Sequence, residues 1–244
     1  MKIKIIMPIT RDIFDADELK TAKRFASEGT EVACVHLEKG PESIEDQYDE
    51  ALAVPGILDE VKKAEDEGYD GVLISCYGDP GLKPARELAN IPIVGPAETS
   101  MLFASALGQR FSIVTIVREV VPLMEDNARI LGVEKLASVR YVGIPVLELE
   151  NEDKLQEALF RESLKAVEQD RAHVIILGCT GMIDVASTLS RRLREEKGYD
   201  IPVIDPAMIS LKFLESLIKL GLKQSRLTYM MPTEKRGPIR RRNG

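Results

Sequence analysis

Short apolar runs alternate with amphipathic stretches along nearly the whole chain. In each amphipathic stretch apolar residues recur every three or four positions; Leu19, Ala22 and Ala26, for example, share one helical face. The predicted strands are residues 2–7, 31–37, 71–74, 91–94, 111–117, 139–144, 173–177 and 201–204. Strands that alternate with helices form parallel sheets covered by those helices, so the pattern predicts an α/β protein.

Helices are predicted between these strands from their start and stop signals. Pro96 and Pro206 stand where two of them begin, because proline suits the first turn of a helix. The first helix is predicted to begin at Asp12 or Asp15, and the others to cover about 57–68, 80–90, 96–108, 119–131, 153–169, 182–197 and 206–220. The polar segment 38–55 is predicted to be a long loop that covers the substrate or contacts another subunit.

The second half of the chain repeats the first. Ile91-Pro92-Ile93-Val94-Gly95-Pro96-Ala97 is matched by Ile201-Pro202-Val203-Ile204-Asp205-Pro206-Ala207. The duplication predicts two pseudo-symmetric flavodoxin-like (Rossmann-like) lobes, each with a four-stranded parallel sheet, and a site in the cleft between them. Residues 1–96 with 206–229 are assigned to lobe 1, residues 97–205 to lobe 2, and residues 230–244 to a mobile basic tail.

Composition narrows the class of protein. The 244 residues include 33 basic and 40 acidic side chains, and the net charge of −7 argues against a general nucleic-acid binder. No apolar run reaches the roughly 18 residues of a membrane-spanning helix, and no signal peptide is recognisable at the start. Three cysteines form no disulfide framework. We therefore expect a cytoplasmic enzyme with free thiols and without membrane partners.

Two cysteines occupy matching places in the two halves. Cys76 follows the third predicted strand of the first half and Cys179 that of the second, and small residues surround both. Backbone N–H groups and a helix start are expected nearby, which would lower the thiol pKa values. Gly78 and Gly181 would let the backbone approach a ligand. A matched pair in matched contexts favours a catalytic role over ordinary burial of cysteine.

Two opposed thiols suit the movement of a proton from one face of a carbon acid to the other. One thiolate removes the proton and the other thiol returns one from the opposite side. Such a reaction needs no cofactor when a carbonyl already activates the carbon, so none is expected. A metal site is not expected either, because no ligand pair among His36, His173 and the cysteines has metal-site spacing.

A few other residues are candidates for minor roles. Thr10 and Thr115 end the first strands of the two halves, where each could bond a substrate carbonyl or remain an ordinary strand-end residue. Asp79 is predicted to cap the helix after Cys76. His36 is expected at the surface and Cys34 in a structural position.

Four segments resemble the cofactor-independent aspartate/glutamate/hydantoin racemase superfamily, and within it the hydantoin racemases. The segments are Gly40-Pro41-Glu42-Ser43-Ile44-Glu45, residues 48–56, Cys76-Tyr77-Gly78-Asp79-Pro80-Gly81-Leu82 and Leu177-Gly178-Cys179-Thr180-Gly181-Met182. The resemblance implies two-thiol racemisation of a 5-substituted hydantoin or allantoin. It also implies that Cys76 and Cys179 are the acid and base. Positions beside the two cysteines and at the ends of the first strands give the substrate-binding candidates Pro8, Thr10, Tyr77, Gly78, Thr115, Thr180 and Gly181.

One departure from the family concerns the substrate. Hydantoin and allantoin racemases usually read Asn-Pro-Asn-Thr after the first strand, whereas this chain reads Met7-Pro8-Ile9-Thr10. Polar contacts expected from the two asparagines are therefore absent. The alternatives that remain open are an amino-acid or allantoin racemase, a maleate isomerase, an arylmalonate decarboxylase and a non-enzymatic small-molecule binding protein. A homo-oligomer is expected from the long segment 38–55.

Overall fold

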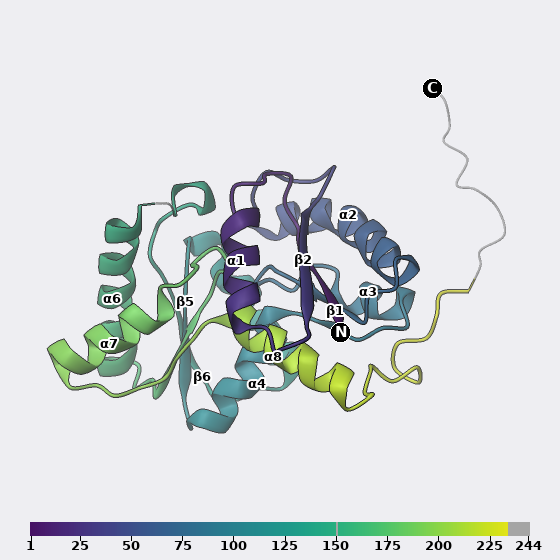
Figure 1. Cartoon of the computed structure of the whole chain (residues 1–244). Helices are drawn as coiled ribbons and strands as arrows, with labels where there is room; N and C mark the ends of the chain where they lie inside the picture. Colours follow the sequence, from purple (N-terminus) through teal and green to yellow (C-terminus); the bar gives the residue numbers. More distant parts are fainter. Residues whose placement is uncertain (150, 234–244) are drawn as a thin grey trace.

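Two parallel sheets, each flanked by helices, lie side by side in the computed structural model, which describes residues 1–149 and 151–233 (Figure 1). The first sheet has the strand order β2-β1-β3-β4 and contains β1 (Lys2–Met7), β2 (Glu31–His36), β3 (Gly71–Ile74) and β4 (Ile93–Val94). The second has the order β6-β5-β7-β8 and contains β5 (Phe111–Thr115), β6 (Leu136–Tyr141), β7 (Val174–Leu177) and β8 (Val203–Ile204). The identical orders confirm the prediction of two four-stranded parallel lobes.

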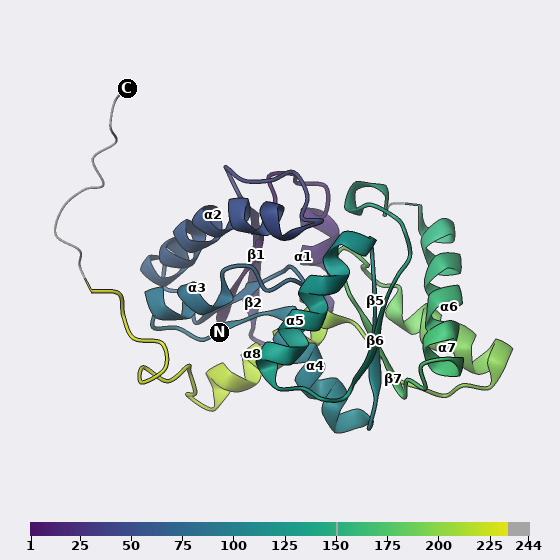
Figure 2. The ribbon, with the colours of Figure 1, turned by 180° about the vertical axis from the view of Figure 1, so that it is seen from behind.

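Helices connect the strands and cover both faces of each sheet (Figure 2). The α-helices are α1 (Asp15–Phe25), α2 (Gln47–Asp66), α3 (Leu82–Leu88), α4 (Pro96–Leu107), α5 (Val121–Leu131), α6 (Glu152–Glu168), α7 (Ala186–Lys197) and α8 (Pro206–Lys219). Two short 3-10 helices are η1 (Arg118–Val120) and η2 (Val146–Glu148). No helix within 1–149 and 151–233 is long and apolar enough to span a bilayer.

The segment predicted as a loop at 38–55 is half helical, so that prediction is wrong from Gln47 onwards. The side chain of Asp46 accepts a hydrogen bond from the Asp49 amide and caps α2. Ala53 and Ile57 then lie on the buried face of the helix and pack into the first lobe. Pro55 does not break this helix, because the cap and the buried face outweigh the hydrogen bond that the proline removes.

The last helix returns the chain to the first lobe. α8 packs against β3, β4 and α1, where Leu211 and Leu214 join the buried cluster that contains Ile5 and Leu73. It also packs along α4, the helix that leaves the first sheet for the second. The division into residues 1–96 with 206–229 and 97–205 stays a prediction, and most of the proposed tail, 234–244, lies outside the described residues.

A buried carboxylate fastens α8 to the turn between α1 and β2. Glu215 is 2% exposed and accepts hydrogen bonds from the amide and hydroxyl of Ser27, at 2.7 and 2.6 Å, and from the Thr30 hydroxyl at 2.7 Å. Burial by itself would raise the pKa of Glu215, but these bonds and Lys212 lower it to about 2. The folded protein therefore holds Glu215 in its ionised form.

We predict that Glu215→Gln lowers the free energy of unfolding by about 1–3 kcal/mol at pH 7, since hydrogen bonds to a charged group are lost. The pKa of Glu215 is lower in the folded protein than its ordinary value of 4.5, so its contribution is present above pH 4.5 and disappears as the pH falls toward 2. Urea unfolding of wild type and variant across this range measures the difference. The exposed Glu195→Gln is the control, and equal effects of both substitutions would contradict the prediction.

Candidate active site

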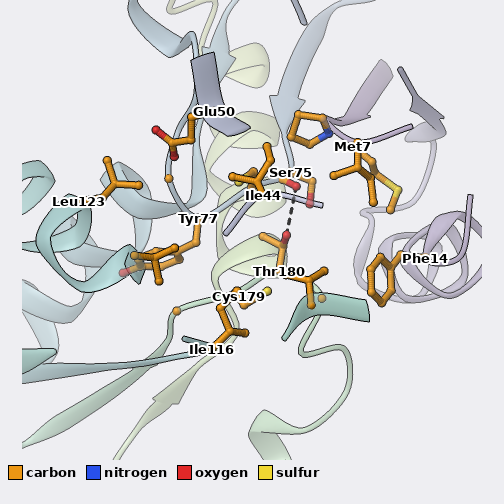
Figure 3. A pocket seen from close by; sticks show the side chains of 18 of the residues that line it. Met7, Phe14, Ile44, Glu50, Ser75, Tyr77, Ile116, Leu123, Cys179 and Thr180 are labelled. Carbon is orange, nitrogen blue, oxygen red and sulfur yellow. Dashed lines mark hydrogen bonds between the residues drawn. The ribbon is translucent and has the colours of Figure 1, made fainter. Parts of the chain in front are cut away.

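A pocket opens where the carboxyl ends of β3 and β7 face each other. Its lining comes from both lobes and contains both matched cysteines (Figure 3). The residues around it are Met7, Pro8, Ile9, Phe14, Glu18, Ile44, Glu50, Ser75, Cys76, Tyr77, Gly78, Ile116, Val120, Leu123, Met124, Val146, Gly178, Cys179, Thr180 and Gly181. The edges of two parallel sheets thus build one mainly apolar site, as the duplication predicts.

The two cysteines are held in equivalent ways. In the first lobe the Ser75 amide donates to the Ile6 carbonyl at 2.7 Å, which extends the pairing of β3 with β1 by one residue before Cys76. In the second lobe the Gly178 amide donates to the Val114 carbonyl at 2.8 Å, one residue before Cys179. Each thiol therefore follows the last backbone bond between its strand and the central strand of its sheet.

Packing permits only glycine before Cys179. A Cβ atom at Gly178 would lie 2.7 Å from side-chain atoms of both Ile113 and Thr115, too close for any side chain. The hydroxyl of Thr115 donates to the Gly178 carbonyl at 2.9 Å. Thr115 is fully buried beneath this turn and does not line the pocket, so its place is under the cysteine and not beside a substrate.

The other sequence candidates divide between pocket and surroundings. Five of them line the pocket: Pro8, Tyr77, Gly78, Thr180 and Gly181. Thr10 does not, because its amide and its hydroxyl both donate to the Pro41 carbonyl, at 2.9 and 3.2 Å. His36 lies outside as well and contacts Asp15 at 2.7 Å.

Asp79 caps a helix, but not the one predicted. Its carboxylate accepts hydrogen bonds from the amides of Ala97 and Glu98, at 3.0 and 2.8 Å, and so caps α4 instead of α3. Sequence distance favoured the nearer helix, whereas the fold brings the start of α4 against the turn after Cys76. Asp79 thereby fixes the cysteine turn to the helix that leads into the second lobe.

Hydrogen bonds join the two lobes around the pocket. The Thr180 hydroxyl donates to the Ser75 carbonyl at 3.1 Å, and the Asn127 amide group of α5 donates to the Gly78 carbonyl at 3.0 Å. These bonds place Cys76 and Cys179 in one pocket.

Both thiols have raised pKa values, contrary to the expectation from sequence. Burial, followed by the charge of Glu50, raises the pKa of Cys76 well above its ordinary value, against an opposing bond from the Gly78 amide. Burial also raises the pKa of Cys179 to about 11, against bonds from the amides of Gly181 and Met182. The amides lie where they were expected, but the helices that follow the two turns, α3 and α7, begin only at Leu82 and Ala186.

Two pocket carboxyl groups were not anticipated. Glu18 of α1 is 2% exposed and accepts a hydrogen bond from the Ser75 hydroxyl at 3.0 Å; burial and the nearby Asp205 raise its pKa to about 8. Burial and the nearby Asp79 also raise the pKa of Glu50 in α2 to about 8. Each resembles an ordinary surface glutamate in sequence, although Glu50 falls within the segment 48–56 that carries the family resemblance.

Comparison with known proteins identifies the family of this chain. The family model described as Asp/Glu/hydantoin racemase matches residues 11–214, and the chain belongs to this family. A hydantoin racemase from a Pseudomonas species (strain NS671) is 40% identical over 238 residues, which cover 96% of this chain and 93% of that protein. The fold and the relatives together define an isomerase of the racemase class.

Solved structures of racemases have the same fold as this chain. An allantoin racemase from Klebsiella pneumoniae superposes with a TM-score of 0.90 at 35% identity and covers 96% of this chain and 95% of its own. An allantoin racemase from Pseudomonas fluorescens superposes with a TM-score of 0.91 at 33% identity, with 98% and 100% of the two chains covered. The two-lobed fold is therefore that of racemases of this family.

We predict that Cys76 and Cys179 react slowly with iodoacetamide at pH 7 and that their rates rise about tenfold per pH unit up to at least pH 10, because only the thiolate reacts. Burial holds both thiols protonated below their raised pKa values. Mass spectrometry of the labelled peptides follows each cysteine separately. Cys34, whose pKa burial raises to about 12, is an internal comparison. A plateau of either rate between pH 7 and 8 would show a thiolate at neutral pH and contradict the prediction.

Proposed function

We propose that this protein racemises 5-substituted hydantoins with Cys76 and Cys179 as a paired acid and base. The observation that carries the proposal is that the two thiols line one pocket from equivalent positions in two duplicated lobes. Racemisation interconverts mirror images, so the catalyst needs an equivalent group on each side of the carbon. The hydantoin racemases among the relatives supply the substrate class.

The proton follows a balanced path between the two sulfurs. One cysteine, as thiolate, takes the hydrogen from the ring carbon, and the electron pair of that bond moves onto the neighbouring carbonyl oxygen as an enolate. The other cysteine, as thiol, then protonates the carbon from the opposite face while the enolate returns to the carbonyl. The enzyme finishes with the thiol and thiolate exchanged, ready for the opposite enantiomer.

The electrostatics of the pocket oppose ionisation of both thiols at the same time. Negative charge on Cys179 raises the pKa of Cys76, so ionisation of one sulfur opposes ionisation of the other. A single thiolate beside a thiol is the state that the reaction needs. The raised pKa values also make each thiolate a stronger base toward a weakly acidic carbon, at the cost of a smaller thiolate fraction.

The pocket favours a substrate with an apolar 5-substituent over allantoin. Met7 and Ile9 occupy the places of two family asparagines and line the pocket beside Phe14 and Ile44. These side chains offer no partner for a polar ureido group, whose burial without hydrogen bonds is costly. An alkyl or benzyl substituent instead gains from burial against the same surface.

The proposal also covers the cofactor, the location and the partners of the protein. The ring carbonyl activates the carbon, so the proton transfer needs no cofactor. We also propose that the protein acts in the cytoplasm as a homo-oligomer on a small-molecule substrate, without nucleic-acid or membrane partners.

We predict that Cys76→Ser and Cys179→Ser each lower the racemisation of L-5-benzylhydantoin by at least ~100-fold, because serine is a far weaker acid and base at this position. Polarimetry measures the loss. In deuterated buffer each variant should still exchange the ring hydrogen of one enantiomer, and the two variants should prefer opposite enantiomers.

The control is Cys34→Ser, which leaves both pocket thiols in place and should racemise at the wild-type rate. Full racemisation by either pocket variant would refute the two-thiol mechanism. Faster turnover of allantoin than of the benzyl compound by the wild type would refute the proposed substrate preference but not the mechanism.

A further inference from the structure

Glu50 is a pocket residue that the two-thiol reaction leaves without a role. It lies in the first turn of α2 and lines the pocket together with Cys76 and Gly78. Figure 3 shows it on the same side of the pocket as Leu123 and Tyr77, opposite Met7 and Phe14. Its Oε1 atom is buried and has no hydrogen-bond partner in the described part of the chain.

Several other carboxyl groups in the protein interior are hydrogen-bonded by the protein itself, whereas the buried Oδ1 atom of Asp15, like Oε1 of Glu50, has no partner among the described residues. Asp79 accepts from two amides of α4, Glu215 from Ser27 and Thr30, and Glu18 from the Ser75 hydroxyl. A buried acceptor without a partner destabilises the folded state, so natural proteins rarely keep one without a functional reason. Asp15 contacts His36 through its other carboxyl oxygen and lies outside the pocket, whereas Glu50 lines it, so the bare oxygen of Glu50 points to a ligand.

The position of the Glu50 carboxyl group close to Cys76 also indicates that it contacts a ligand. A Cβ atom at Gly78 would lie only 1.5 Å from the Oε1 atom of Glu50, so the carboxyl packs directly against the backbone two residues after Cys76. A negative charge on Glu50 is also the largest cause, after burial, of the raised pKa of Cys76. The carboxyl therefore lies within reach of a ring bound at that thiol.

The protonation state of Glu50 decides whether its carboxyl group can donate a hydrogen bond to a substrate. The acidic groups near it are Asp79 and Cys76, and within residues 1–149 and 151–233 no cation offsets them; burial and Asp79 raise the pKa of Glu50 to about 8. At neutral pH the carboxyl is mainly uncharged and has a hydrogen to donate. Proton removal from the substrate carbon puts negative charge on the adjacent carbonyl oxygen, and a donor placed there stabilises the transition state.

We propose that Glu50 is a catalytic residue that, as a neutral acid, donates a hydrogen bond to the substrate's ring carbonyl and stabilises the enolate during proton transfer. The inference rests on the proposed racemase function and extends it. The proton of Glu50 stays on the carboxyl group throughout, so the exchange of protons between Cys76 and Cys179 is unchanged.

Three variants separate this role from the alternatives. Glu50→Gln keeps a donor that cannot ionise, Glu50→Leu removes the donor at similar volume, and Asp59→Asn removes an exposed carboxylate from the same helix as a control. For racemisation of L-5-benzylhydantoin we expect kcat/KM within about tenfold of wild type for Glu50→Gln, a loss of about 100- to 1000-fold for Glu50→Leu, and no change for Asp59→Asn. Thermal unfolding followed by circular dichroism verifies that each variant is folded.

The pH profile gives a second readout. Glu50 loses its donor hydrogen as the pH rises through about 8, so the ratio of wild-type to Glu50→Gln kcat/KM should fall between pH 7 and 9. The ratio at one pH cancels ionisation of the substrate itself. A rising ratio would mean that the carboxylate is the active form, and it would overturn the proposal.

Two further outcomes are decisive. An electrostatic effect on Cys76 alone would make Glu50→Leu equal to Glu50→Gln at every pH, because both remove the charge, and that equality would refute the hydrogen-bond role while leaving the racemase function standing. Absence of racemisation by the wild type would refute the proposed function and this inference with it.

Discussion

The burial of two thiols at the facing ends of two parallel sheets is the constraint on which the site depends. Each sulfur follows the last hydrogen bond between its strand and the central strand of its sheet, so its position is set by the β-ladder and not by a flexible loop. The same burial raises both thiol pKa values. Position and basicity of the two groups thus have one physical origin.

The lobes must also stay in register with each other for the proposed reaction, because proton transfer to and from one carbon depends on the separation of the two sulfurs. Bonds across the boundary, such as that from the Thr180 hydroxyl to the Ser75 carbonyl, join the two cysteine turns directly. Asp79 ties the Cys76 turn to α4, the helix that leads into the second lobe, and α8 returns to pack on both β3 and α4. The helix α4, which connects the two lobes, and the hydrogen bonds between the lobes are therefore both attached to the turn that carries Cys76.

The pocket has few polar side chains, and most of its wall is apolar. The carboxyl side chains at its wall are those of Glu18 and Glu50, and both are held toward their neutral forms by burial. Met7 and Ile9 leave the remaining wall apolar. A neutral, mainly apolar site of this kind strengthens each hydrogen bond to a developing negative charge.

Local pattern determined much of this protein. Alternating strands and helices, the repeated Ile-Pro segments and the matched cysteines were sufficient to predict two parallel lobes with Cys76 and Cys179 at equivalent strand ends, since these features depend on residues close together in the chain. Tertiary structure alone decided the rest. It placed Thr115 beneath Gly178, moved the Asp79 cap to α4, started α2 at Gln47, and buried Glu50 beside Gly78. Burial and charge at these sites come from segments distant in sequence, and the pKa values of the thiols follow from that surrounding protein.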